Sequence, residues 1–210
     1  MSKYYSDNNN LHNRTMTMTG QGQITAVPNI AVIHLGVETR GENLVNIQAE
    51  NAQITQSIIQ ALQRMGVSDI KTIQYSINKV YDYEEGRQID RGYSVRNILE
   101  IKTANLDRVG NIVDMAVNMG ANVVELISFD VSNREYYYQQ ALNIAVMNAI
   151  EKANSVAMNL NSSTQPVPIK IIENSTSPIQ PYFRQELAAT TPIMSGNIII
   201  EANVTVDFAF

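Results

Sequence analysis

The last fifteen residues, "GNIIIEANVTVDFAF" (196–210), alternate apolar and polar side chains more clearly than any other part of the chain. The even-numbered residues from Ile198 to Phe210 are apolar, and Glu201, Asn203, Thr205 and Asp207 lie between them. Because successive side chains of a strand point to opposite faces, this pattern predicts a half-buried antiparallel strand. Such a strand needs partner strands and a second layer that covers its apolar face.

Similar patterns predict the other elements. Strands are expected at 15–28, 29–39, 122–132 and in "PVPIKIIENS", with two more in "IKTIQYSINKVYDY" and "RGYSVRNILEIKT". Helices are expected at about 43–65, 106–119 and 134–160, and the first two end in Met-Gly. We expect strand 15–28 to pair with 29–39. Glu125 should share a face with Val123 and Ile127, and Gly20 and Gly22 should mark a bulge or bend rather than a phosphate loop.

The order of these elements predicts the fold class. Residues 29–132 give β-α-β-β-α-β, the order of a ferredoxin-like core, and the long third helix and the C-terminal strands pack on it. The class is therefore α+β with mainly antiparallel sheets. The near-heptad spacing of the first helix, with Asn51 at one seam position, also admits a coiled coil, but packing on a sheet is favoured.

The domain boundaries follow from composition. Residues 1–14 are polar and predict a flexible tail, and 15–210 form one domain that can divide into two subdomains. Residues 174–196 hold three prolines and little periodicity, which is typical of an extended loop or arm. Within it Tyr182, Phe183 and Arg184 are candidate interface anchors, and a plain surface loop is the alternative.

Composition excludes several kinds of chemistry. The chain has no cysteine, two histidines and a net charge of −5, so thiol catalysis, Cys-ligated zinc and a His-rich metal site are excluded, and nucleic acid is disfavoured as a partner. The sequence has no Gly-x-Ser-x-Gly elbow, P-loop or dinucleotide fingerprint, so we expect no catalytic residues and no cofactor. We expect a structural role for His34.

The segment "KVYDYEEGRQIDRGY" (79–93) is the one concentration of carboxylates, tyrosines and arginines. Placed between two strands, it predicts a solvated hairpin tip in which the arginines pair with the carboxylates. Its candidate interface residues are Tyr81, Tyr83, Arg87, Arg91 and Tyr93. Two other interpretations stay open. A hydrolase would need Asp82, Glu84 or Asp90 to be buried, and a small-molecule or ion binder would use 81–96 together with Tyr136–Tyr138.

The N-terminus has no apolar signal core, and no apolar run approaches the length of a membrane span. The expected location is therefore cytoplasmic by default, with a cell or spore surface as the alternative.

The run "TGQGQITAVPNIAVIHLGVETRGENLVNIQAENAQITQSIIQALQRMGV" resembles the opening of the bacterial SIMPL-domain family. Gly20, Gly22, Pro28, Ala31, Gly36 and Val37 match the family pattern, and Asn29 stands in place of the usual aspartate. The resemblance covers about 15–210. It implies an α+β fold and a tendency to form homo-oligomers, it supplies no catalytic residues, and some members are periplasmic or surface antigens or are linked to oxidative stress.

Together these observations predict a non-enzymatic, self-assembling structural or interaction protein. It would be homo-oligomeric, with further protein partners possible, and either stress-associated or part of a cell- or spore-surface assembly. The alternative is the small-molecule or ion binder described above.

Overall fold

The computed structural model describes residues 15–174 and 193–210, and the chain divides into two compact units. The described part of unit 1 comprises residues 15–26, 133–174 and 197–210, and that of unit 2 comprises residues 27–132 and 193–196. Each unit has its own antiparallel sheet and its own core, so the predicted α+β class is confirmed. The predicted tail 1–14 and most of the predicted arm 174–196 lie outside the described residues.

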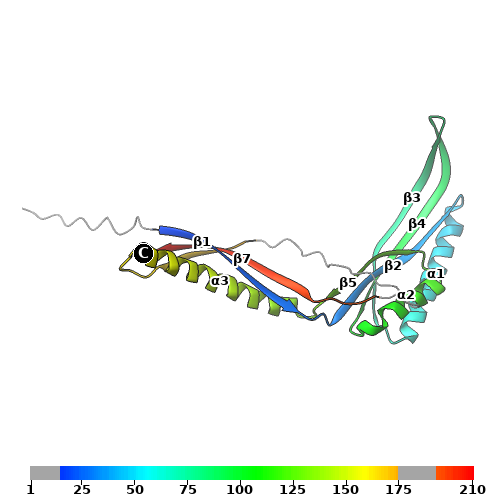
Figure 1. The fold of residues 1–210 in the computed structure, drawn as a ribbon. Helices are drawn as coiled ribbons and strands as arrows, with labels where there is room; N and C mark the ends of the chain where they lie inside the picture. Colours follow the sequence, from blue (N-terminus) through cyan, green and yellow to red (C-terminus); the bar gives the residue numbers. More distant parts are fainter. Residues whose placement is uncertain (1–14, 175–192) are drawn as a thin grey trace, which may run out of the picture. The chain divides into compact units, whose positions relative to one another are not determined.

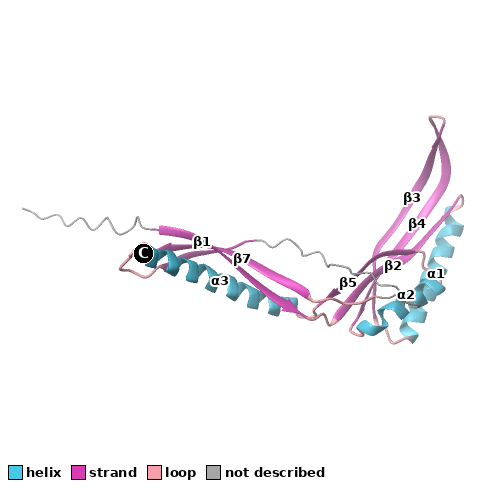
Figure 2. Cartoon of the chain, viewed as in Figure 1, coloured by secondary structure: helices cyan, strands magenta, loops and turns pink. Residues whose placement is uncertain are grey.

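Unit 2 is a four-stranded sheet with two helices (Figures 1 and 2). In chain order its elements are β2 (Ile30–Gly41), α1 (Leu44–Arg64), β3 (Asp69–Glu84), β4 (Arg87–Thr103), the 3₁₀ turn η1 (Leu106–Arg108), α2 (Val109–Asn118) and β5 (Val123–Asp130). The strands lie in the order β3-β4-β2-β5, and every neighbouring pair is antiparallel. The predicted β-α-β-β-α-β order is therefore present, while its ferredoxin-like label stays a prediction.

The core of unit 2 lies between this sheet and the two helices. The odd-numbered residues of β2 from Ala31 to Val37 are at most 1% exposed and pack against Ile58 and Leu62 of α1 and Ile112 of α2. Burying such aliphatic side chains contributes roughly 1.5–3 kcal/mol each. The helix α1 therefore packs on the sheet, as favoured from the sequence.

Unit 1 is a three-stranded sheet covered by one long helix. It contains β1 (Thr15–Ala26), α3 (Arg134–Asn159), β6 (Val167–Asn174) and β7 (Ile198–Ala209), with the strands in the order β1-β7-β6. The closing strand, β7, is central, and its residues from Ile200 to Phe208 alternate between buried and half-buried, as its pattern predicts. Figure 1 shows α3 running along the sheet, where it packs on β1 and β7.

The contact between α3 and β1 is unusually close. Alanines at every fourth position of α3, from Ala141 to Ala157, are at most 5% exposed and face the sheet. A Cβ on Gly20 would overlap the carbonyl oxygen of Ala145, and one on Gly22 would overlap that of Ala141. The pairing of β1 with β7 runs without a register shift, so the predicted bulge or bend is wrong. These glycines let the helix backbone approach the strand.

Two strand predictions are also corrected. The first strand pairs with β7 and not with the adjacent 29–39: Ala26 lies opposite Ile198 and Thr15 opposite Ala209. Pro28 ends the strand where the chain passes from unit 1 to unit 2. In β5 the register with β2 shifts beside Leu35, so that Glu125 has no partner residue in β2. Its side chain pairs with Arg96 rather than facing the core with Ile127, which is the usual effect of a β-bulge.

Candidate functional site

The outer part of the β3–β4 hairpin is exposed: residues 77–91 are exposed apart from Val80 and Ile89, which are half-buried. The two strands are joined by Glu85 and Gly86, whose φ angles are 50° and 78°, which is the conformation that a two-residue hairpin turn requires. Figure 1 shows the hairpin extending past the end of α1. The turn lies where the sequence predicts it. The hairpin presents a free edge along the whole of β3, and a second, short one along residues 87–92 of β4, which β2 does not reach.

The hairpin carboxylates remain in water. The side chains of Asp82, Glu84 and Asp90 are 58%, 56% and 51% exposed. The hydrogen bond from Lys79 and the N–H of Gly92 lower the pKa of Asp90, which is the opposite of what a general acid needs. Because the hydrolase hypothesis required burial of at least one of the three, the structure contradicts it.

Two cationic groups of the hairpin, Lys79 and Arg91, pair with carboxylates of the hairpin itself. Lys79 pairs with Asp90, and its ammonium lies 5.8 Å and 5.3 Å from the ring centres of Tyr81 and Tyr93. Arg91 pairs with Asp82 and Glu84. Exposed ion pairs of this kind are screened by water and add little to the stability of the fold, so their effect is to order the hairpin.

The structure brings five of the eight predicted interface residues together on this hairpin. Tyr83 is 70% exposed, and Arg87 lies beside the turn. The set consists of Tyr81, Tyr83, Arg87, Arg91 and Tyr93. The other three, Tyr182, Phe183 and Arg184, lie outside the described residues.

Sequence reasoning missed an apolar strip further down β3. Ile73, Tyr75 and Ile77, which we name the β3 strip, are 41%, 48% and 40% exposed. Tyr75 and Ile77 stand opposite Asn97 and Val95, on the face that the helices cover elsewhere in the unit. The sequence did carry a signal for it, because apolar and polar residues alternate over 72–78. The sequence does not reveal that α1 packs over β2 and β4 and leaves Ile73, Tyr75 and Ile77 of β3 exposed.

The opposite face of the same sheet carries charged rows that were also not predicted. Arg96 bridges Glu38 and Glu125, and Glu38 also accepts from Arg40 and Ser94, which lowers its pKa.

In the second row Glu100 lies 2.9 Å from the Lys71 ammonium and 3.1 Å from His34 Nε2. The hydrogen bond from Lys71, with smaller contributions from His34 and Lys102, holds the pKa of Glu100 at about 2. His34 thus has the structural partner that its predicted role implies.

The three consecutive tyrosines lie at the start of α3, in unit 1 rather than in the unit that carries the hairpin. Tyr136 and Tyr137 meet edge to face with ring centres 5.4 Å apart, and the hydroxyl of Tyr138 donates to Glu173 of β6. That bond raises the pKa of Tyr138 because it favours the neutral phenol. The hydroxyl of Tyr138 is therefore fixed by a contact within unit 1. Tyr136, in contrast, is 53% exposed.

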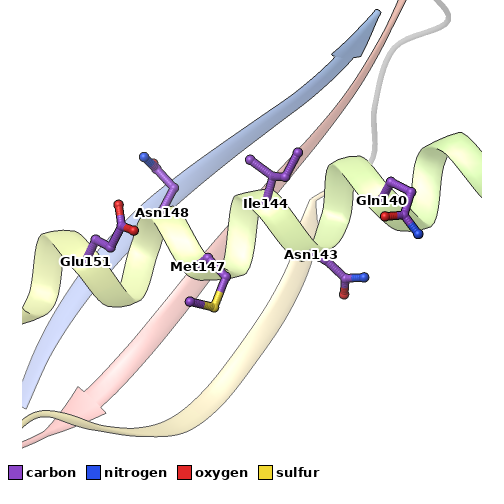
Figure 3. A pocket seen from close by; sticks show the side chains of 6 residues that line it. All are labelled: Gln140, Asn143, Ile144, Met147, Asn148 and Glu151. Carbon is purple, nitrogen blue, oxygen red and sulfur yellow. The ribbon is translucent and has the colours of Figure 1, made fainter. Parts of the chain in front are cut away.

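Helix α3 bears a shallow open hollow of about 290 Å³. The six residues that line it project from successive turns of this one helix (Figure 3): Gln140, Asn143, Ile144, Met147, Asn148 and Glu151. It includes neither the hairpin nor Tyr136–Tyr138, so the ligand-binding alternative gains no support from it. Among the described residues, no three His, Asp or Glu side chains gather as a metal site.

Comparisons with known proteins agree with the resemblance noted in the sequence. The model of the SIMPL family, "Protein of unknown function (DUF541)", matches residues 16–208. The "26 kDa periplasmic immunogenic protein" of Brucella melitensis is 27% identical, over 92% of this chain and 83% of that protein. The "Uncharacterized protein YggE" of Escherichia coli K12 is 23% identical, over 90% and 78%.

Among solved structures, an amidase of the hydantoinase/carbamoylase family from Burkholderia phymatum aligns with a TM-score of 0.25 and 13% identity, over 60% of this chain and 34% of that one. A likeness this low carries no argument about fold or activity.

The predicted cytoplasmic location, with its cell- or spore-surface alternative, is contradicted, because the Brucella relative is named as a periplasmic protein. No helix in residues 15–174 or 193–210 is both long and apolar enough to cross a membrane. The family match spans nearly the whole chain, both sheets included. The chain belongs to the SIMPL family of proteins of unknown function.

Proposed function

We propose that this protein is a non-enzymatic, homo-oligomeric structural or interaction module. The observation that carries the proposal is the β3–β4 hairpin, in which an edge strand of sixteen residues presents five apolar or aromatic side chains that are 40–70% exposed. An exposed strand edge is a template for pairing with another chain, and an apolar patch beside it adds a hydrophobic contribution.

The composition of the hairpin supports a protein partner. Tyrosine and arginine are enriched in protein interfaces because they combine a large contact area with polar atoms. The hairpin carries three tyrosines and two arginines: Tyr81, Tyr83, Tyr93, Arg87 and Arg91. The carboxylates around them limit non-specific aggregation.

The location proposed for this module is the periplasm or its equivalent outside the cytoplasm. The name of the Brucella relative supports it, since that protein is similar over 92% of this chain. A chain without cysteine also keeps the same covalent structure in an oxidising compartment.

The test is the mass of the protein in solution, measured by light scattering and native mass spectrometry at micromolar concentrations. We expect a species of at least twice the chain mass of 23.4 kDa. Replacing Ile77 with lysine should lower that mass, because it places a charge in the β3 strip. Val117→Lys is the matched control, since Val117 is 48% exposed on α2, a helix that packs on α1 and β2. A strict monomer at all concentrations would refute the proposal.

A further inference from the structure

The free strand edges of the two sheets differ in how they are protected. Two backbone groups of β1 are occupied by side chains from α3: Lys152 donates to the Thr19 carbonyl at 2.9 Å, and Asn148 accepts from the Gln21 N–H at 3.4 Å. On β6, Pro168 lacks an N–H and Lys170 adds a charge, both of which discourage pairing. The remaining short edge, β5, carries the bulge at Glu125.

The edge of β3 is longer and more open. Its register with β4 shifts near Ile73 and again near Val80, and between these points Gln74–Lys79 runs as an uninterrupted strand. The side-chain contact to the β3 backbone found within the described residues is a local one, from Asp82 to the N–H of Tyr83. This regular stretch is therefore the part of the edge best suited to accept another strand.

The two faces of this stretch differ in polarity. Tyr75 and Ile77 point to the face that carries the helices, and both are at least 40% exposed. Gln74, Ser76 and Asn78 point to the other face and are uncharged. A partner strand must match an apolar pair on one side and three hydrogen-bonding residues on the other.

The same stretch of a second copy meets both requirements. We infer that two copies of this chain pair through β3, antiparallel and about a two-fold axis normal to the sheet, with Ser76 opposite Ser76 of the second copy. Tyr75 of each copy then lies opposite Ile77 of the other, and Gln74 lies opposite Asn78. Aromatic and β-branched side chains directly opposite each other stabilise a strand pair, and no like charges face each other over these positions.

The choice of register follows from Lys79. An antiparallel two-fold pair joins only residues on the same face, so the two neighbouring registers are centred on Tyr75 and on Ile77. The register centred on Tyr75 would bring Ile73, where the pairing of β3 with β4 is irregular, opposite Ile77 of the second copy. The other register is centred on Ile77. That register would place Lys79 opposite Tyr75 of the second copy, although the Lys79 ammonium is already held by Asp90 and by the rings of Tyr81 and Tyr93. Centring on Ser76 leaves these contacts intact.

The pairing is tested with single cysteines, because the natural chain contains none. In the inferred register the thiol of Ser76→Cys meets its own counterpart, with Cβ atoms about 4.5–5.5 Å apart, close to disulfide geometry. Asn78→Cys is the matched control on the same face. Its counterpart lies four residues along the strand, roughly 13 Å away, which a disulfide cannot span.

With oxidised glutathione at micromolar protein, we expect Ser76→Cys to form a covalent dimer at least tenfold faster than Asn78→Cys. The double variant Gln74→Cys/Asn78→Cys should cross-link as readily as Ser76→Cys, because those positions face each other twice. Equal or faster cross-linking by Asn78→Cys or by Ile77→Cys would overturn the inference. Circular dichroism confirms that each variant is folded before oxidation.

This inference rests on the proposed self-association, and the two can fail separately. If the unsubstituted chain is oligomeric by mass but Ser76→Cys shows no preference, the β3 pairing is wrong and self-association stands. If the chain is monomeric throughout, both are wrong.

Discussion

Two glycines of β1 show how a residue type can be dictated by a neighbouring backbone. Gly20 and Gly22 lie against the carbonyl groups of Ala145 and Ala141 in α3, and the helix meets them with alanines. The Gly-x-Gly spacing therefore serves close helix–strand packing, because alternate residues of a strand face the same helix. It has neither the turn nor the anion-binding role that such spacing often indicates.

Gly20→Ala and Gly22→Ala should each destabilise the protein by about 1–3 kcal/mol, because the new methyl group must displace the helix backbone. The measurement is urea unfolding followed by circular dichroism. Gly196→Ala is the control, since open space surrounds the site of its Cβ, and it should be neutral or slightly stabilising. Equal effects at all three positions would show that helix packing is not the cause.

Glu100 should contribute to the loss of folding stability at acid pH. The pKa of Glu100 is lowered from 4.5 to about 2, chiefly by Lys71, so its ionised form stabilises the fold above about pH 4.5. That contribution is lost as the pH falls from about 4.5 toward 2, because the unfolded state binds the proton first.

Glu100→Gln should therefore lose less stability than the unsubstituted chain between about pH 7 and about pH 3. Urea unfolding at both pH values measures this difference. Glu42→Gln, at an exposed position before α1, should keep the original pH dependence. If Glu100→Gln keeps it as well, the Lys71 pair does not contribute to folding.

At the scale of the element, the position of α1 on its sheet depends on one buried amide. Asn51 is fully buried, and its Nδ2 group donates to the carbonyls of Val37 in β2 and Val95 in β4, at 3.0 Å each. The near-heptad spacing of α1 also suited a coiled coil, where a polar seam residue selects register at a cost in stability. Here the same asparagine joins the helix to two strands.

Asn51→Leu separates the two interpretations. In the sheet-packed structure the variant should lose about 1–3 kcal/mol, because buried carbonyls lose their donor. In a coiled coil the leucine would instead strengthen association. Thermal unfolding and solution mass measure both effects, and Gln53→Leu, at an exposed position of the same helix, should leave both nearly unchanged.

At the scale of the whole molecule, the two units differ in how much of each is formed by a single stretch of chain. Residues 27–132 form one uninterrupted segment, whereas unit 1 is assembled from three separate segments. The ends of the continuous segment are tied together: the Asn29 amide donates to Ser132 Oγ, and its oxygen accepts from the Ser132 N–H at 2.7 Å. Asn29 thus closes unit 2.

The fragment 27–132 should fold alone into an α+β structure with a cooperative thermal transition, because it contains nearly all of its own core. The loss of Ile193, which packs on that core from outside the fragment, should lower its stability only modestly. Circular dichroism and two-dimensional NMR at low concentration provide the measurement. A fragment without dispersed amide signals would mean that unit 2 depends on the rest of the chain.

Much of the architecture was predictable because it is local. The three helices and the alternation of β7 follow from periodicity, and the Glu85–Gly86 turn follows from residue type. The candidate site was only half predictable. The sequence located the tyrosines and carboxylates on a hairpin, but their exposure depends on how far α1 reaches across the sheet, which no local pattern encodes.

The sequence by itself determined the α+β class, the order of the elements and the absence of cysteine chemistry, because these depend on residue type and on spacing along the chain. Only the tertiary structure decided that β1 joins β7 and that Gly20 and Gly22 serve helix packing. It also decided that β3 keeps a free edge with Tyr75 and Ile77 beside it. The physical reason is that each of these features depends on contacts between residues far apart in sequence, whose energies exceed the local preferences that a pattern reports.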